Sequence, residues 1–172
     1  TTPDPVHLHQ AVAALAKDHV EHLAVEASSH GLAQNRLDGL RISAGAFTNL
    51  TRDHLDYHKT FEHYLDAKMM LFEQLLCPGS PAILNADIPE ASDIKKRCLA
   101  AGLTVFSVGE KGDDIRILSS TQTENGQLLK LKMADGEYDV PLPLVGDFQA
   151  SNAVVAAGLV IATGGELSLV RH

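Results

Sequence analysis

Hydrophobic residues recur along the chain in blocks that switch between helical spacing and short continuous runs. Apolar positions at intervals of three and four predict helices over residues 6–17, 60–76, 90–101 and 150–162. Short apolar runs predict buried strands over 23–25, 42–47, 81–85 and 103–108. Strands that alternate with helices in this way predict an α/β fold, with a mostly parallel sheet and flanking helices.

The alternation of strands and helices stops between residues 115 and 142. Three short strands are predicted over 115–120, 127–133 and 137–142, and the turn sequences 124–126 and 134–136, each ending in glycine, separate them. Two successive hairpins of this kind predict a small antiparallel β insert. Gly146 then begins a turn into the last helix, which Gly164 and Gly165 end.

One residue breaks the amphipathic pattern of the helix over 60–76. Thr60 is a suitable N-cap, and at about 100° per residue Lys68 points between the apolar side chains of Tyr64 and Phe72. Two interpretations are open. A desolvated lysine loses proton affinity, so that its amine can be neutral near physiological pH. Alternatively, only the methylene stem is buried and the ammonium reaches water.

Polar residues gather where two of the predicted strands end. His54 lies in the polar segment after the strand over 42–47, and the strand over 23–25 ends in Glu26. Ligands bind at such strand ends in open α/β sheets, so we expect Glu26, His54 and Lys68 to converge. A carboxylate, an imidazole and an amine suit a hard cation poorly. If the amine captures carbon dioxide it becomes a carbamate, and the set then suits magnesium or manganese.

Four segments carry a resemblance to a known family. EASSHGLAQNRLDGLR, FTNLTRDHLDYHKTFEHYLDAK, ILNADIPE and GDFQASNAVVAA, in this order, resemble the central ATP-using domain of the Mur ligases. The resemblance covers nearly the whole chain and is most specific from Phe47 to Lys68. It implies a sheet like that of the phosphate-loop NTPases. It also implies that Glu26, His54 and carbamylated Lys68 bind Mg²⁺, and that Lys68 and His54 are catalytic.

The same resemblance implies an activity and its substrates. ATP would phosphorylate the D-glutamate carboxylate of UDP-MurNAc-L-Ala-D-Glu, and the amine of a diamino acid would attack the acyl phosphate, in cytoplasmic peptidoglycan synthesis. The enzyme would be a monomer. The positions that hold the nucleotide-peptide are matched by Thr1, Thr2, Ser28, Gln34 and Arg36, and those near the adenosine of ATP by Asn85 and Asn152. An asparagine at a strand end or helix start is equally often a cap.

The chain also departs from the family pattern. It contains no glycine-rich loop of the GxxGKT kind, and Gln149 stands where many relatives have asparagine. We therefore expect residues 1–172 to be a central-domain fragment without the phosphate loop, the UDP-binding domain and the C-terminal domain, and to be inactive alone. Meso-diaminopimelate and lysine both remain open as the added amino acid. So do a folylpolyglutamate or cyanophycin type of ligase and a non-catalytic nucleotide-peptide binding module.

Composition and charge limit the kinds of partner and chemistry that we expect for this protein. The formal net charge of −8 argues against nucleic acid and acidic membranes as partners, and no apolar run is long enough to span a membrane. Cys77 and Cys98 have no metal-ligand spacing, which favours reduced thiols. No GxSxG elbow surrounds Ser28, so hydrolase chemistry is disfavoured. His58 and His63 have two interpretations: they shape the site by hydrogen bonding, or they are solvated side chains, and we favour the second.

Overall fold

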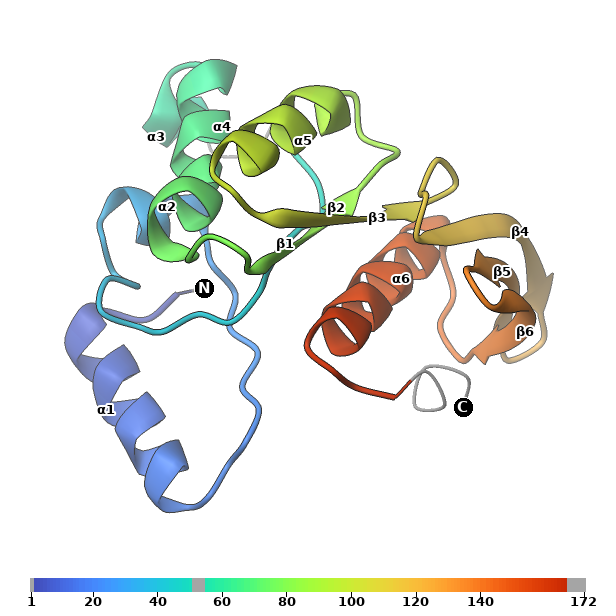
Figure 1. Ribbon diagram of the computed structural model, residues 1–172, viewed down its shortest axis with the longest axis horizontal. Coiled ribbons are helices and arrows are strands. Elements are labelled where there is room, and N and C mark those ends of the chain that lie inside the picture. Colours follow the sequence, from blue (N-terminus) through green and yellow to red (C-terminus); the bar gives the residue numbers. More distant parts are fainter. Residues whose placement is uncertain (1, 51–54, 167–172) are drawn as a thin grey trace. The chain divides into compact units, whose positions relative to one another are not determined.

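The computed structural model describes residues 2–50 and 55–166, and the chain divides into two compact units (Figure 1). The first unit comprises Thr1–Ile42 and Thr51–Leu76, and the second comprises Ser43–Leu50 and Cys77–His172. Each unit is built around its own set of elements. The candidate residues for the metal and the nucleotide-peptide fall in the first unit, and the two candidate ATP residues fall in the second.

The first unit is helical, and side chains that accept backbone hydrogen bonds begin its helices. Asp4 caps the first helix by accepting the N–H of His7 at 3.1 Å. Thr60, the predicted N-cap, accepts the N–H of His63 at 3.1 Å. These caps satisfy backbone donors that have no partner inside a helix. The helices are α1 (Pro5–Lys17), α2 (Ser29–Ala33), α3 (Leu55–His58) and α4 (Phe61–Met70), which the π-helical turn η1 (Leu71–Leu75) extends.

One predicted strand is absent from this unit, and that prediction was wrong. Residues 23–25 have no strand conformation, and the side chains of Leu23 and Val25 are 51% and 39% exposed. A strand needs a neighbour that pairs with its backbone, and within residues 2–50 and 55–166 no strand pairs with this segment. The apolar run shows that the segment is hydrophobic, but it does not show whether another strand is available to pair with it. Glu26 therefore follows an extended segment and not a strand end.

The second unit is a six-stranded sheet covered by two helices. Strands β1 to β4 run parallel in chain order, and β5 and β6 add to β4 in antiparallel orientation. Helices α5 (Ala91–Ala100) and α6 (Asp147–Ala162) pack on opposite faces (Figure 1). The strands are β1 (Gly45–Phe47), β2 (Pro81–Asn85), β3 (Thr104–Gly109), β4 (Ile115–Thr123), β5 (Gly126–Met133) and β6 (Gly136–Leu142). The predicted α/β class is confirmed.

The antiparallel strands are part of this sheet and not a separate insert. Strand β4 pairs with β3 through Val108 opposite Ile115 and Gly109 opposite Arg116. Parallel neighbours usually need a crossover of about a dozen residues or more. Here the short segment 110–114 is enough to connect the two parallel strands. Only the last residues of β3 pair with the first residues of β4, and the rest of β4 extends past the end of β3. Sequence patterns could show the hairpins but not this junction.

Two side chains fold the segment between β3 and β4. The carboxylate of Asp87 accepts the backbone N–H groups of Glu110 and Lys111, both at 2.8 Å. The hydroxyl of Ser107, itself buried, accepts the N–H of Asp113 at 2.9 Å. These bonds give the tight turn partners for its backbone donors, which would otherwise lose hydration at the edge of the core.

The core of the second unit lies between α6 and the sheet. Its buried members from the strands include Ile83, Val108, Ile115, Leu129, Leu131 and Val140, and those from α6 are Ala150, Val154, Val155 and Ala157. A side-chain Cβ at Gly158 would lie 3.0 Å from Cγ2 of Ile83 and 3.2 Å from Cγ1 of Val108. The helix therefore sits closer to the sheet than most side chains would allow at this position. The opposite side of α6 faces away from this core, and Ala156 on that side is exposed.

The structure also bears on membrane-spanning helices and on the two cysteines. Across that part of the chain, no helix is both long enough and apolar enough to cross a bilayer. Cys98 is buried in α5 and Cys77 is exposed, and both are free thiols. Cys98 therefore contributes to the packing of α5, whereas Cys77 lies at the surface.

Candidate functional site

Lys68 lies in the last turn of α4, one turn after Tyr64. Its Nζ atom is 5.4 Å from the centroid of the Tyr64 ring, and the side chain is half-buried. Burial lowers the pKa of Lys68, and the negative charge of Glu26 opposes this by raising it. Glu26 is therefore close enough for its charge to act on Lys68, and the joint site stays a prediction. The lowered pKa favours the interpretation in which the amine is available in its neutral form.

The backbone beside Glu26 is fixed by the buried side chain of Thr2. Its Oγ1 donates to the carbonyl of Glu26 at 2.7 Å and accepts the N–H of Ser28 at 2.9 Å. The same oxygen is 3.0 Å from Oγ of Ser28. A Cβ at Gly31 would lie 2.7 Å from Cβ of Thr2. The N-terminal segment can approach α2 this closely because residue 31 has no side chain.

Arg36 is engaged in hydrogen bonds inside the unit. Its Nε and Nη2 donate to Oε1 of Gln34 at 2.9 and 2.6 Å, and its Nη1 donates to the carbonyl of Thr2 at 2.9 Å. Nε2 of Gln34 donates to the hydroxyl of Tyr57 at 3.2 Å. Three of the predicted substrate residues, Thr2, Gln34 and Arg36, thus form one network. Ser28 joins it through Thr2, whereas Thr1 lies outside the described residues.

Aromatic rings from α2, α3 and α4 pack beside this network. His58 is 7% exposed, and its Nε2 is 2.9 Å from Oγ of Ser29, which is 3% exposed. The ring of His58 stacks on Tyr64 at 5.2 Å and meets Tyr57 edge-on at 4.8 Å. The interpretation of His58 as a solvated side chain was wrong. Its burial depends on contact with Ser29, far away in the sequence, and no local pattern signals that contact.

Two further side chains of α4 lie outside its buried face. His63 is exposed, as predicted. Phe61, the first residue of α4, is 36% exposed and so lies at the margin of the apolar face. The buried face of α4 consists of Tyr64, Ala67 and Met69, with Lys68 beside it.

The described part of the candidate metal site consists of Glu26 and Lys68. Among residues 2–50 and 55–166, no three His, Cys, Asp or Glu side chains form a cluster that could hold a metal ion. His54, the third predicted ligand, lies outside these residues. The described pair fits a divalent cation if the amine carries a carbamate, because the pair then offers two anionic oxygen groups. As an amine and one carboxylate alone it fits poorly.

The predicted ATP residues lie in the second unit. Asn85 ends β2 and is 6% exposed; its Nδ2 donates to the carbonyl of Thr48 at 2.9 Å and to Oγ of Ser151 at 3.0 Å. Its Oδ1 accepts the N–H of Asp87 at 3.0 Å. Asn85 therefore ties the end of β1 to α6. Asn152, next to Ser151, is exposed on α6.

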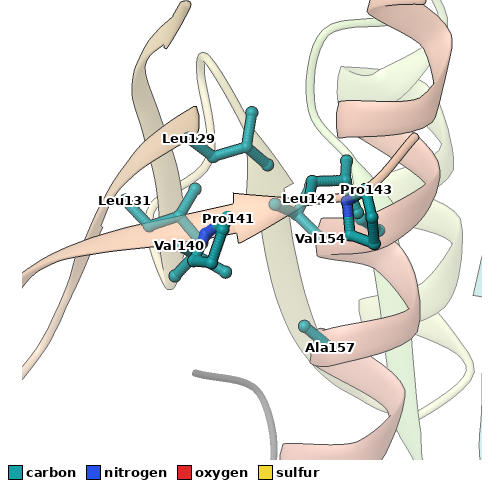
Figure 2. A pocket seen from close by; sticks show the side chains of 9 residues that line it. Leu129, Leu131, Val140, Pro141, Leu142, Pro143, Val154 and Ala157 are labelled. Atoms are coloured by element: carbon teal, nitrogen blue, oxygen red, sulfur yellow. The ribbon is translucent and has the colours of Figure 1, made fainter. Parts of the chain in front are cut away.

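A cavity of about 190 Å³ lies between β5, β6 and α6 (Figure 2). Its lining includes Leu129, Val140, Pro143 and Val154, and none of its lining residues has a titratable side chain. Such a lining offers no group for acid–base chemistry, charge neutralisation or metal binding. The pocket is partly open to solvent, and it contains none of the candidate site residues.

Comparison with known proteins places this geometry in context. The family described as Mur ligase middle domain matches residues 1–160. The UDP-N-acetylmuramoyl-L-alanyl-D-glutamate–2,6-diaminopimelate ligase of Chelativorans sp. (strain BNC1) is 50% identical over 164 residues, which is 95% of this chain and 34% of that protein. The protein of the same name from Brucella melitensis is 49% identical, with the same coverage. The chain thus spans about a third of the length of these relatives.

A solved structure agrees with the sequence comparison. A structure of a UDP-N-acetylmuramoyl-L-alanyl-D-glutamate–2,6-diaminopimelate ligase superposes with a TM-score of 0.89 at 31% identity, covering 99% of this chain and 35% of that one. The agreement extends over both units, including the helical part that carries Lys68.

Proposed function

This chain belongs to the Mur ligase family, whose middle domain matches residues 1–160, and on that premise we propose that the protein carrying it is an ATP-dependent amide ligase. It would join a diamino acid to UDP-MurNAc-L-Ala-D-Glu during peptidoglycan synthesis in the cytoplasm, acting as a monomer. We favour meso-diaminopimelate over lysine, because the relatives at 50% and 49% identity carry 2,6-diaminopimelate in their names. The same identities favour this branch over a folylpolyglutamate or cyanophycin type of ligase and over a non-catalytic binding module.

The observation that carries the proposal is the half-buried Lys68, which lies against the Tyr64 ring and within the electrostatic influence of Glu26. Burial lowers the pKa of Lys68, which increases the fraction of neutral amine. Carbon dioxide reacts with the neutral form: the nitrogen lone pair attacks carbon and the nitrogen loses a proton, leaving a carbamate. A simple structural lysine would gain nothing from lost proton affinity.

Glu26, His54 and carbamylated Lys68 would hold Mg²⁺. A magnesium ion there supplies positive charge that offsets the repulsion between a carboxylate and the phosphates of ATP. The chain's own contribution is to present these side chains from fixed backbone. Thr2 holds the carbonyl of Glu26, and the Tyr64 ring lies against Lys68.

The nucleotide-peptide would bind along the network of Thr2, Ser28, Gln34 and Arg36, with Thr1 beside it. Three of the five N–H groups of the Arg36 guanidinium are used inside the protein, so that its fork is held in one orientation. A fixed guanidinium suits a carboxylate or phosphate of the substrate. Because this network includes Thr2, which also holds Glu26, a bound substrate would lie close to the candidate metal site.

The reaction would proceed in two displacements. A D-glutamate carboxylate oxygen attacks the γ-phosphorus of ATP, and ADP leaves with the bonding electrons. The amine of the diamino acid then attacks the acyl carbon, phosphate leaves, and the ammonium of the new amide nitrogen loses its extra proton. Catalysis of this kind depends on orientation and charge neutralisation.

The second unit would contribute to ATP binding. Exposed Asn152 would contact the adenosine, and buried Asn85 would fix the start of α6 through Ser151. The phosphate loop, the UDP-binding domain and the domain that recognises the diamino acid would be supplied by other parts of the whole protein. The 172 residues alone would therefore be inactive.

The test is ligation by the full-length protein. Purified protein is incubated with ATP, Mg²⁺ and UDP-MurNAc-L-Ala-D-Glu, together with either meso-diaminopimelate or lysine, and the product is identified by its mass. We expect the tripeptide product with meso-diaminopimelate and release of ADP. Parallel reactions with folate and glutamate test the folylpolyglutamate alternative. Absence of a tripeptide product with either diamino acid would refute the proposal.

A further inference from the structure

We infer that His58 is a positioning residue that joins the substrate-side loop to the lysine helix. The substrate-side loop denotes residues 28–36, and the lysine helix is α4. The inference rests on the proposed function, since it assigns His58 a role in the same reaction. It begins from an imidazole that is 7% exposed and lies between these two segments.

On the loop side, His58 is bonded to Ser29. The Nε2 to Oγ distance is 2.9 Å, and both side chains are buried. Water cannot readily replace either partner there, so solvent does not compensate for the loss of this hydrogen bond. Ser29 is the first residue of α2 and follows Ser28, whose hydroxyl caps that helix by accepting the N–H of Gly31 at 3.1 Å. A shift of Ser29 would therefore move Ser28 as well.

On the helix side, His58 stacks on Tyr64. The rings are 5.2 Å apart with an interplanar angle of 24°, and the other contact of Tyr64 relevant here is Lys68, whose Nζ is 5.4 Å from the ring centroid. One ring therefore separates the imidazole from the amine. The position of His58 is transmitted to Lys68 through direct packing contacts.

Tyr57 connects His58 to Gln34, near the C-terminal end of the substrate-side loop. Its ring meets that of His58 edge-on at 4.8 Å and 81°, and its hydroxyl accepts a hydrogen bond from Gln34 at 3.2 Å. Gln34 in turn accepts two hydrogen bonds from Arg36. Consecutive residues of α3 thus contact both the start and the end of the substrate-side loop.

These contacts indicate that His58 acts indirectly, by positioning other residues and not by contacting the substrate. His58 is too buried to offer its ring to a large substrate, and its Nε2 is engaged with Ser29. Its function would be to keep the residues that hold the nucleotide-peptide in register with Lys68. Loss of that register should weaken productive binding of the nucleotide-peptide and slow the reaction, without altering the groups that hold ATP.

The experiment compares variants of the full-length enzyme in the ligation assay. His58→Phe keeps an aromatic ring for the stack but removes the hydrogen bond, and Ser29→Ala removes the same bond from the other side. We expect each to raise KM for UDP-MurNAc-L-Ala-D-Glu about tenfold and to lower kcat several-fold, with KM for ATP within about twofold of wild type. The double variant should show less than the sum of the two single effects, because both changes remove the same hydrogen bond.

Two further variants provide rescue and control. His58→Gln can place an amide nitrogen near the position of Nε2, so it should restore part of the lost KM effect. His63→Phe makes the same chemical change at an exposed histidine of α4, and it should match wild type. If His58→Phe lowers the unfolding midpoint strongly, Ser29→Ala decides the question, because it removes a single oxygen atom.

The outcomes separate the inference from the proposed function. A wild-type enzyme that forms no tripeptide product overturns both. With an active wild type, folded Ser29→Ala and His58→Phe variants with unchanged KM for the nucleotide-peptide overturn the inference alone. A loss of kcat with both KM values unchanged also overturns it, since a smaller folded fraction produces that result.

Discussion

Arg36 donates two hydrogen bonds to a single oxygen of Gln34, from Nε at 2.9 Å and from Nη2 at 2.6 Å. A third bond, from Nη1, reaches the carbonyl of Thr2. The residue that the sequence assigns to substrate binding therefore also assembles the loop that surrounds it. Substituting Arg36 should affect the shape of the site as well as its charge.

Arg36→Lys keeps the charge but loses the planar fork. We expect kcat/KM for UDP-MurNAc-L-Ala-D-Glu to fall by roughly ten- to a hundredfold, about 1.5 to 3 kcal/mol, with little change in KM for ATP. Steady-state kinetics of the full-length enzyme, with each substrate varied in turn, measures this. Gln34→Ala removes the shared acceptor and should produce part of the same defect. A defect confined to ATP would move Arg36 to the nucleotide site.

Lys68→Ala removes the amine that would become the carbamate. Ligation should be abolished, and short carboxylic acids or bicarbonate should partly restore it by supplying an anionic oxygen group in the vacated space. Rates are measured with and without the added acid. Lys96→Ala changes an exposed lysine of α5 and should behave as wild type under both conditions. Wild-type turnover by Lys68→Ala would exclude an essential carbamate.

Glu26→Ala removes one proposed magnesium ligand and leaves its backbone contact with Thr2 in place. The magnesium concentration that gives half-maximal rate should rise, because the remaining ligands hold less charge. His54→Ala should act in the same direction. Titrations of activity with magnesium at saturating ATP provide the measurement. Curves that coincide with wild type for both variants would require withdrawal of the metal assignment.

Gly158→Val should destabilise the second unit. Its Cβ would lie 3.0 Å from a methyl carbon of Ile83, so the side chain would force α6 away from the sheet, at a cost of about 1 to 3 kcal/mol. Ala156→Val adds a similar side chain to the exposed side of the same helix and should change stability by less than about 0.5 kcal/mol. Urea unfolding of both variants gives the comparison. Equal stabilities would contradict the close packing described for Gly158.

Local patterns predicted most of the second unit well. The apolar run over 81–85 coincides with β2, and the hairpin turns lie where glycine ends each turn sequence. Helix α6 begins at Asp147, three residues earlier than the pattern suggested. These features depend on residues close together in the chain, which is the information that periodicity contains.

The errors have a different origin. Residues 23–25 look like a strand because they are apolar, but strand formation depends on a partner elsewhere. His58 looked like a solvated histidine because its burial depends on Ser29 and Tyr64. The partial burial of Lys68 was predicted because the helical pattern places this residue between apolar side chains, whereas the convergence with Glu26 was expected from a strand end that the structure does not contain. The proposed site residues Thr1 and His54 lie outside the described residues, and their roles stay predictions.

The junction between β3 and β4 has a consequence for the order of folding. Within residues 2–50 and 55–166, strands β4, β5 and β6 pair with their neighbours in the chain. Strand β1 instead pairs with β2 across the intervening lysine helix, with Gly45 opposite Ala82. Contacts of short sequence separation form faster than those that close long loops. The three-stranded meander should therefore acquire protection from hydrogen exchange early in refolding. Strand β1, which carries the chain toward His54, should be among the last elements to become protected.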